Sequence, residues 1–503
     1  FIFFIYSIYI IRYHYDGHHL GLLFSNALDI IKGKDPYKEV FIQYGFLTTL
    51  IHSLILILFD SKVFFISFFG AIFYSFSILL ISLSIKKLVN SKFALISTII
   101  ILFNHPIPLL PWSNYIAFFF VTLSVFLITK TKINYYLFGF LLSLAILSRQ
   151  DIIIPIFFSF LLLCILNINS FKKEYFIYFL KLFLGLSLPI IFFFSYLIYS
   201  ENFLYWKSYL VIPNFYLDIY EKTPLDLIIN FIFFFSTKSF FNFIVTPQFF
   251  IISIILFFNS ILIFKKIFSK KKISNNILYV SILSILLSSM ALQIEIFRLY
   301  TSVIIGIIPI LYFLNKLTNT YLKKNLIKLL ILPSLFSFIF YPFGNNETFN
   351  KNYTLNKDFE ISNKKFSFYS WPKNKTYSIN VITEISNNCD VEYLDNLTFD
   401  ALYSTIGDFK RISMFPYKQS SIKHNKFHDY IDSLKNPEIN YIDKINLQMQ
   451  TANIILLVNK NNNIYKNLKI ETNNKYSNIK INESEIEGKP DYLNIFVPKK
   501  CLK

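Results

Sequence analysis

Residues 46–59, FLTTLIHSLILILF, decide how the chain is threaded through a membrane. A helix of 14 residues measures roughly 21 Å, whereas the hydrocarbon core of a bilayer is roughly 30 Å thick. We therefore expect this segment to remain on one side of the bilayer. If it crossed instead, the loop that precedes it would lie on the opposite side.

The surrounding sequence is typical of a polytopic membrane protein. Of its 503 residues, 54% are hydrophobic and 19% are aromatic, which is more than a water-soluble chain of this size carries. We expect about eleven transmembrane helices, the first of them an anchor rather than a signal peptide. They are residues 1–11, 63–85, 93–103, 115–129, 135–147, 152–166, 176–199, 249–264, 277–292, 299–314 and 326–340.

Lysines fix the orientation of these helices. Residues 1–341 carry a net charge of +15 out of the +19 of the whole chain. If residues 46–59 do not cross, the lysine-rich loops all fall on one side, which the positive-inside rule identifies as the cytoplasm. The loops 12–62, 104–114, 148–151, 200–248 and 293–298 and the tail then lie outside. No basic stripe of the kind that binds nucleic acid is present.

The composition changes after residue 341 to one rich in Asn, Lys, Ser and Asp. Strands are predicted at 377–385, 453–458 and 493–497, and a helix at 428–434. We therefore expect two domains, an all-α membrane domain over 1–341 and a small extracytoplasmic α/β domain over 342–503. Cys389 and Cys501 could pair there if that side is oxidising, whereas Cys164 lies in an apolar run.

The first outer loop opens with RYHYDGHH, residues 12–19. Asp16 is a good N-cap for a helix that begins at Gly17. Apolar residues at positions 20, 23, 24, 27, 28 and 31 have helical spacing, and Gly33 is a natural C-terminal cap. We expect this helix to lie flat on the membrane, and residues 225–235 and 240–245 to form interfacial helices as well.

The histidines beside Asp16 raise the question of a metal site. His18 and His19 would point about 100° apart on a helix, and no distant His or Cys pair completes a set of ligands. The sequence therefore requires no metal, and the cofactors stay unknown. A divalent ion shared with a substrate phosphate remains an open alternative.

Arginine is rare in this chain, since only four of its 49 basic residues are Arg. Arg12, Arg149 and Arg298 are expected at the outer ends of spans, where a guanidinium fork suits a phosphate. The alternative is a local ion pair, with Asp151 or with Glu295. Asp16 as general base and Arg149 and Arg298 as donor-phosphate ligands would fit an enzyme that acts on an anionic lipid headgroup.

The order of motifs resembles the C-type membrane glycosyltransferases, which include the protein O-mannosyltransferases and the lipid A aminoarabinose transferase. The order runs from HYDGHH through GKDPYKEVFIQYGFL, a short apolar segment, KKLVNSK, HPIPLLPWSN and LSRQD. The resemblance covers residues 1–170 by motif and the remainder by architecture. Where relatives often carry a second acid, this chain has Asn114.

The resemblance implies a multi-pass enzyme of the bacterial plasma membrane that transfers a sugar from a polyprenyl-phosphate donor. The acceptor would be a lipid, a glycan or a protein outside the cytoplasm, and the transfer would be inverting. Asp16 matches the essential acid of the first outer loop, and Arg149 matches a basic residue near the donor phosphate. The tail would correspond to the soluble outer domain of the family.

Other functions are compatible with parts of the pattern. A polymerase or ligase of lipid-linked oligosaccharides would use related chemistry with a different donor. A transporter of lipid-linked sugars predicts inverted repeats and discontinuous helices, neither of which the sequence displays. A sensor whose tail binds a ligand would need no acid on the outer face.

Overall fold

The computed structural model describes most of the chain. The described residues are 2–13, 15–104, 112–130, 132–167, 173–211, 247–269, 273–288, 301–340, 361–371, 373–398, 400–411, 413–417, 429–430, 432–433, 441–451, 454–459, 475–486 and 489–502. The expected interfacial helices at 225–235 and 240–245 lie outside them. Of the expected helix at 428–434, the described residues 429, 430, 432 and 433 are helical.

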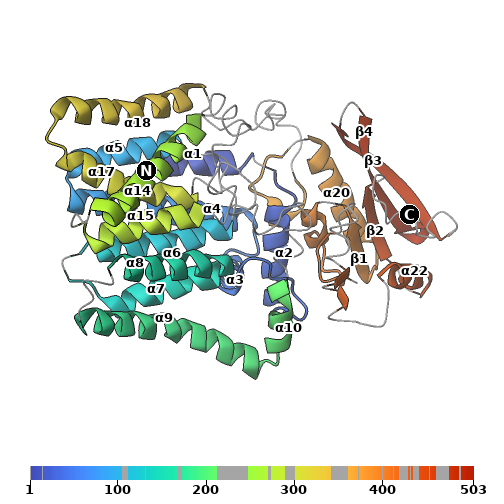
Figure 1. The fold of residues 1–503 in the computed structure, drawn as a ribbon. Coiled ribbons are helices and arrows are strands. Elements are labelled where there is room, and N and C mark those ends of the chain that lie inside the picture. The colour runs from blue at the N-terminus through green and yellow to red at the C-terminus, as the bar shows by residue number, and fades with distance from the viewer. Residues whose placement is uncertain are drawn as a thin grey trace.

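A bundle of roughly parallel helices forms the larger part of the molecule (Figure 1). Each of the eleven predicted apolar segments overlaps one of its helices, because long apolar runs between polar turns are a strong helical signal. The helices are α1 (Ile2–Ile11), α4 (Phe64–Leu88), α5 (Ser91–Phe103), α6 (Ser113–Ile128), α7 (Tyr135–Ser148), α8 (Ile153–Leu166), α9 (Lys173–Tyr199), α14 (Pro247–Ser269), α15 (Asn275–Ser288), α17 (Ile307–Lys316) and α18 (Thr320–Phe340).

Local polar residues set several of the helix ends. The side chain of Asn90 accepts a hydrogen bond from the backbone of Phe93 at the start of α5, at 3.0 Å. Asn134 does the same for Leu137 at the start of α7, at 3.1 Å. Such caps satisfy backbone groups that the first helical turn leaves without partners.

The surface of the bundle is apolar. Three of the described helical stretches, Phe64–Leu88, Phe176–Tyr199 and Phe250–Phe268, are long and apolar enough to cross a membrane. Large apolar side chains are exposed along α8 and α9, among them Phe157, Phe183 and Phe192. Surfaces of this kind are stable in lipid and not in water, which indicates a multi-pass membrane protein.

Two short helices of the first loop, residues 12–62, lie at one end of the bundle. They are α2 (His19–Ile31) and α3 (Phe46–Leu58). At its 13 residues α3 remains too short to cross a bilayer. Ser53 of α3 donates a hydrogen bond to the carbonyl of Ala27 in α2, at 3.1 Å, so the two helices pack together.

Helix α2 ends as the sequence predicts. Gly33 has a φ of +79°, and its N–H donates to the carbonyl of Ile30 while that of Lys34 donates to Asp29. This pair of bonds is a Schellman motif, in which a glycine takes the left-handed position. The start differs from the prediction, since the helix begins at His19 rather than at Gly17.

The surroundings of α2 also differ from the prediction. Every residue from Leu20 to Asp29 is buried, including those on the polar side of the helix. The polar side does not face water from a membrane surface, because the C-terminal domain (residues 361–502) covers it. Figure 1 shows α2 and the short helix α10 (Phe203–Ser208) lying across the end of the bundle that carries this domain.

The C-terminal domain contains a four-stranded sheet in the order β1-β2-β4-β3. The strands β1 and β2 are parallel and the other pairs are antiparallel. A disulfide joins Cys389 to Cys501, so it ties the end of α20 to the end of the domain. The elements are α20 (Lys373–Asn388), β1 (Tyr393–Leu397), α22 (Tyr441–Thr451), β2 (Ile454–Asn459), β3 (Tyr476–Ile486) and β4 (Lys489–Pro498).

Two of the predicted strands are confirmed and one is wrong. The predicted strands 453–458 and 493–497 correspond to β2 (Ile454–Asn459) and β4 (Lys489–Pro498), but residues 377–385 lie inside the helix α20. The β-branched residues of that stretch favoured a strand. Ile379, Ile382 and Ile385, however, recur every three residues and are all buried, so packing of one helical face decides the structure.

Candidate functional site

Asp16 caps the start of α2. One carboxylate oxygen, Oδ1, accepts hydrogen bonds from the backbone N–H groups of His18 and His19, at 3.2 and 2.9 Å. These are two of the donors that the first turn of a helix leaves without partners, and the helix dipole favours a negative charge there. The predicted capping role of Asp16 is confirmed.

The other oxygen of Asp16 contacts a histidine. Oδ2 lies 3.0 Å from Nδ1 of His19, three residues along the chain. The side chains are 13% exposed for Asp16 and 26% exposed for His19, so both can be reached from outside. The ring of His19 also packs against Trp112, just before α6, with ring centres 4.7 Å apart.

The C-terminal domain holds the residues on either side of Asp16. The hydroxyl of Tyr15 donates a short hydrogen bond to Oδ2 of Asp400. The N–H of Leu402 donates to the carbonyl of Gly17 at 3.3 Å. A Cβ on Gly17 would lie 2.2 Å from Oδ1 of Asp400, so only glycine allows this close approach. Lys375 completes the contact, with its Nζ 3.5 Å from Oδ2 of Asp400.

Arg12 reaches the same domain. Its carbonyl accepts a hydrogen bond from the backbone of Ser370 at 2.8 Å, and its Nε donates to the carbonyl of Phe368 at 3.2 Å. Arg12 was one of three arginines predicted at the outer ends of spans. In the structure it anchors the segment that leads into Asp16.

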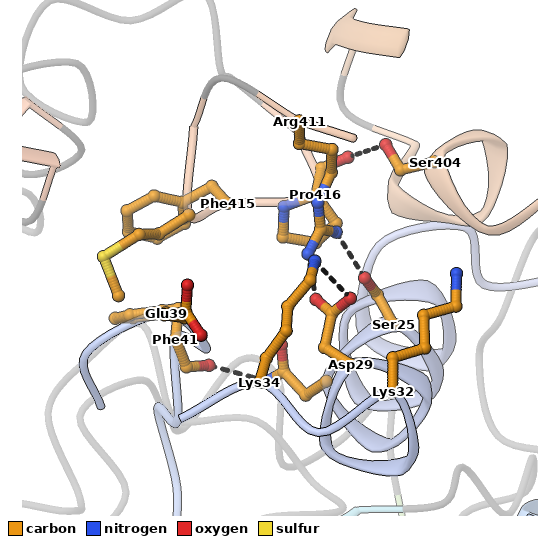
Figure 2. Close-up of polar contacts among 12 residues, drawn as sticks. Ser25, Asp29, Lys32, Lys34, Glu39, Phe41, Ser404, Arg411, Phe415 and Pro416 are labelled. Atoms are coloured by element: carbon orange, nitrogen blue, oxygen red, sulfur yellow. Dashed lines mark hydrogen bonds and ion pairs between the residues drawn. The ribbon is translucent and has the colours of Figure 1, made fainter. Parts of the chain in front are cut away.

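The opposite end of α2 is fixed by a buried ion pair. Arg411 of the C-terminal domain donates to the carboxylate of Asp29 and to the hydroxyl of Ser25, and the side chains of Arg411 and Asp29 are only 6% and 8% exposed. Lys34 also contacts the carboxylate of Asp29, at 2.8 Å between Nζ and Oδ1 (Figure 2). Burial lowers the pKa of Lys34, and the nearby charge of Arg411 adds to this effect.

Arg149 makes the local pair that was the alternative to phosphate binding. Its Nε and Nη2 both donate to the carboxylate of Asp151, at 2.7 Å for the shortest contact of each. The side chain of Arg149 is 16% exposed. Burial opposes its charge, but the carboxylate of Asp151 outweighs this and raises the pKa of Arg149. The guanidinium is thus rigid and permanently charged, and Nη1 makes no hydrogen bond to any described residue.

The segment around Arg149 packs on the first loop, residues 12–62. The N–H of Gln150 donates to the carbonyl of Tyr44 at 3.2 Å, and its side-chain amide donates to the hydroxyl of Tyr37 at 3.2 Å. A Cβ on Gly45 would lie 2.3 Å from the carbonyl oxygen of Ser148. The two motifs GKDPYKEVFIQYGFL and LSRQD, about a hundred residues apart, are therefore in direct contact.

An aromatic layer connects the surroundings of Arg149 with those of Asp16. Tyr209 donates its hydroxyl to the carbonyl of Tyr37 at 3.1 Å and packs against Phe41, with ring centres 5.6 Å apart. From Phe41 the layer continues through Phe415, at 4.2 Å between ring centres, and then Tyr417 to His18, at 4.7 Å. The two ends of this layer thus contact Gln150, the neighbour of Arg149, and His18, two residues after Asp16.

Some predicted features are not brought into this site. Arg298 and Glu295 lie outside the described residues. Asn114 is buried near the start of α6. In the described part of the chain, no group of three or more His, Cys, Asp or Glu side chains could hold a metal ion.

Two contributors to the site were missed from the sequence. Asp400 and Arg411 belong to the distant tail, and no local pattern links them to loop one. The pairing of His19 with Asp16 did leave a signal, because the side chains of a capping residue and of the residue three positions later lie close together at the start of a helix. That signal was overlooked because the histidines were considered only as metal ligands.

Comparison with known proteins gives few matches. No protein-family model and no curated protein matches the chain. Two solved structures, both of ArnT from Cupriavidus metallidurans, align with 98% of it at 7% sequence identity and a TM-score of 0.47. One is bound to undecaprenyl phosphate and the other is in the apo state, and the alignments cover 96% and 97% of those chains.

Proposed function

We propose that this protein is an integral membrane glycosyltransferase that uses a polyprenyl-phosphate-linked sugar. It would pass the sugar to a lipid, glycan or protein acceptor on the outer face, with inversion at the sugar carbon. The observation that carries the proposal is the Asp16 carboxylate, which is fixed by the start of α2 and accessible between the bundle and the C-terminal domain.

The reaction has two demands, and the candidate residues can meet both. The acceptor hydroxyl must lose a proton as it attacks. The base that removes this proton would depend on the Asp16 carboxylate. The departing polyprenyl phosphate must be stabilised by cations. Arg149 offers a guanidinium that Asp151 holds in place, with Nη1 available, and we assign Arg298 the same role from its predicted position.

The location of the site on the outer face is part of the proposal. The Cys389–Cys501 disulfide supports it, since disulfides persist in oxidising compartments. The C-terminal domain packs on loop one through Asp400 and Arg411, so both must lie on the same side of the membrane. Positive-inside orientation from the lysine loops leads to the same side.

The direct test is transfer by the purified protein in proteoliposomes. Undecaprenyl phosphate linked to a panel of radiolabelled monosaccharides would serve as donor, and an envelope extract of the source organism as acceptor. We expect one donor to be consumed, with release of undecaprenyl phosphate and label in the acceptor fraction. Asp16→Asn should abolish transfer.

Asp60→Asn is the matched control, because Asp60 is an exposed acid in the turn before α4, with an 89% exposed side chain. It should transfer like the wild type. Consumption of lipid-linked oligosaccharides in place of monosaccharides would identify a polymerase or ligase. Movement of the intact donor across the bilayer without cleavage would identify a transporter.

A further inference from the structure

We propose that His19 is the residue that accepts the proton of the acceptor hydroxyl, at its Nε2 atom, and that Asp16 acts by holding His19. This inference rests on the proposed transferase function and names the atom that does the work. The sequence points to Asp16 as the general base, whereas this inference assigns that role to the histidine that Asp16 contacts.

The geometry fixes the imidazole. Asp16 is itself held by two backbone N–H groups, so its Oδ2 presents a stationary acceptor 3.0 Å from Nδ1 of His19. An ionised carboxylate only accepts hydrogen bonds, so Nδ1 carries the ring proton. The lone pair of the neutral ring is then on Nε2, which is the arrangement of a carboxylate-oriented histidine base.

Access favours His19 over Asp16. The side chain of His19 is twice as exposed as that of Asp16, 26% against 13%. Nε2 of His19 forms no hydrogen bond with any residue that the structure describes. By contrast, the two oxygens of Asp16 accept three hydrogen bonds, from the backbone of His18 and from the backbone and ring of His19. An acceptor hydroxyl can therefore approach Nε2 without displacing an existing contact.

Neighbouring rings hold the plane of His19. Trp112 lies on one side, at 4.7 Å between ring centres, and His18 meets it edge-on at 4.6 Å. The titratable groups around it are Asp16 and His18 on its own segment, with Tyr417 of the C-terminal domain packed against His18. Asp16 is the only acid in hydrogen-bond contact with the ring among the described residues.

The step balances without a further reactant. The acceptor oxygen forms a bond to the anomeric carbon while the bond from that carbon to the phosphate oxygen breaks. The hydroxyl proton passes to Nε2, and the imidazolium that forms is stabilised by the Asp16 carboxylate. Polyprenyl phosphate leaves with the bonding electron pair, and the imidazolium returns its proton to water.

His19→Asn tests the assignment. An asparagine amide can replace the Nδ1–H donor to Asp16 but provides no base where Nε2 lies. We expect kcat to fall about 100- to 10,000-fold, the usual contribution of a general base. Binding of undecaprenyl phosphate, measured by native mass spectrometry, should be unchanged. Added imidazole should restore part of the rate to His19→Ala and none to Asp16→Asn.

The pH profile gives a second readout. The acid limb of kcat/KM in the wild type should follow protonation of the imidazole, and it should be absent from the residual activity of His19→Asn. Transfer at more than half the wild-type rate by His19→Asn, with its acid limb retained, would show that Asp16 takes the proton directly and would overturn the proposal.

A spectroscopic measurement does not depend on turnover. In protein labelled with nitrogen-15 at histidine, the His19 signal should report a proton on Nδ1, and Asp16→Asn should abolish that preference. A mixture of tautomers in the wild type would contradict the orienting role. Absence of transfer by the wild type with every donor would instead refute the transferase function itself, so the two failures are distinguishable.

Discussion

Arg411 and Asp29 form a nearly fully buried ion pair that joins the C-terminal domain to helix α2. Replacing Arg411 with Met leaves the carboxylate of Asp29 buried with only Lys34 as a partner. We expect the free energy of unfolding to fall by about 3 kcal/mol, as is usual when one partner of a buried pair is removed. Thermal unfolding of the protein in detergent would measure this.

A second ion pair between the same two elements supplies the control. Lys32 on the end of α2 lies 2.8 Å from Asp408, but the side chain of Asp408 is 80% exposed. Asp408→Asn should cost less than about 1 kcal/mol, because water screens an exposed pair. Equal losses in the two variants would contradict the distinction between buried and exposed pairs.

Membrane sidedness can be tested with single cysteines in a Cys164→Ser background. Asp60→Cys, in the turn between α3 and α4, should react with a membrane-impermeant maleimide added to intact cells. Lys92→Cys, on the first turn of α5, should react only after the cells are permeabilised, because its loop is predicted to be cytoplasmic. Reaction of both in intact cells would refute the predicted threading.

Arg149 is expected to act through the shape of its side chain as well as its charge. Arg149→Lys keeps the charge but cannot form the fork that grips Asp151 and leaves Nη1 available. We expect kcat/KM for the polyprenyl-phosphate donor to fall about 10- to 100-fold, a loss of one or two charge-assisted hydrogen bonds. Unchanged donor kinetics in this variant would show that Arg149 only pairs with Asp151 and does not bind the donor phosphate.

Gly45 lies against the carbonyl oxygen of Ser148, and the added methyl of Gly45→Ala would meet backbone that cannot yield. We expect a loss of about 1–3 kcal/mol in the free energy of unfolding, as overpacking costs. Gly33→Ala is the matched variant, since a Cβ there meets nothing within 4 Å and only the φ of +79° is strained. That strain costs about 1–2 kcal/mol and leaves the contact between loop one and α7 intact.

Much of the bundle could be predicted from the sequence, because apolar runs and their polar ends are local signals. The same holds for Gly33, whose left-handed conformation follows from its place after an amphipathic helix, and for the cap at Asp16. The helix α20 was predicted as a strand because its β-branched residues gave a conflicting signal, which buried contacts at Ile379 and Ile382 overrode.

Less of the candidate site could be predicted from the sequence. Asp16 and Arg149 were identified by residue type and position, and the two ends of one aromatic layer contact residues near them, His18 and Gln150. The contacts of Tyr15 with Asp400 and of Asp29 with Arg411 join residues 385 and 382 positions apart, which no periodicity reveals. The contact of His19 with Asp16 could have been predicted, since a capping residue and the residue three positions later lie close together at the start of a helix.

The contacts that hold residues 12–17 affect the order in which the protein folds during its synthesis. These residues are synthesised before the bundle, whereas the groups that hold them, around Phe368, Ser370 and Asp400, are synthesised after it. The segment that carries Asp16 is therefore made without these C-terminal partners, which are synthesised only after the whole bundle. The contacts that fix this segment can form only after the C-terminal residues have been made and have folded against it.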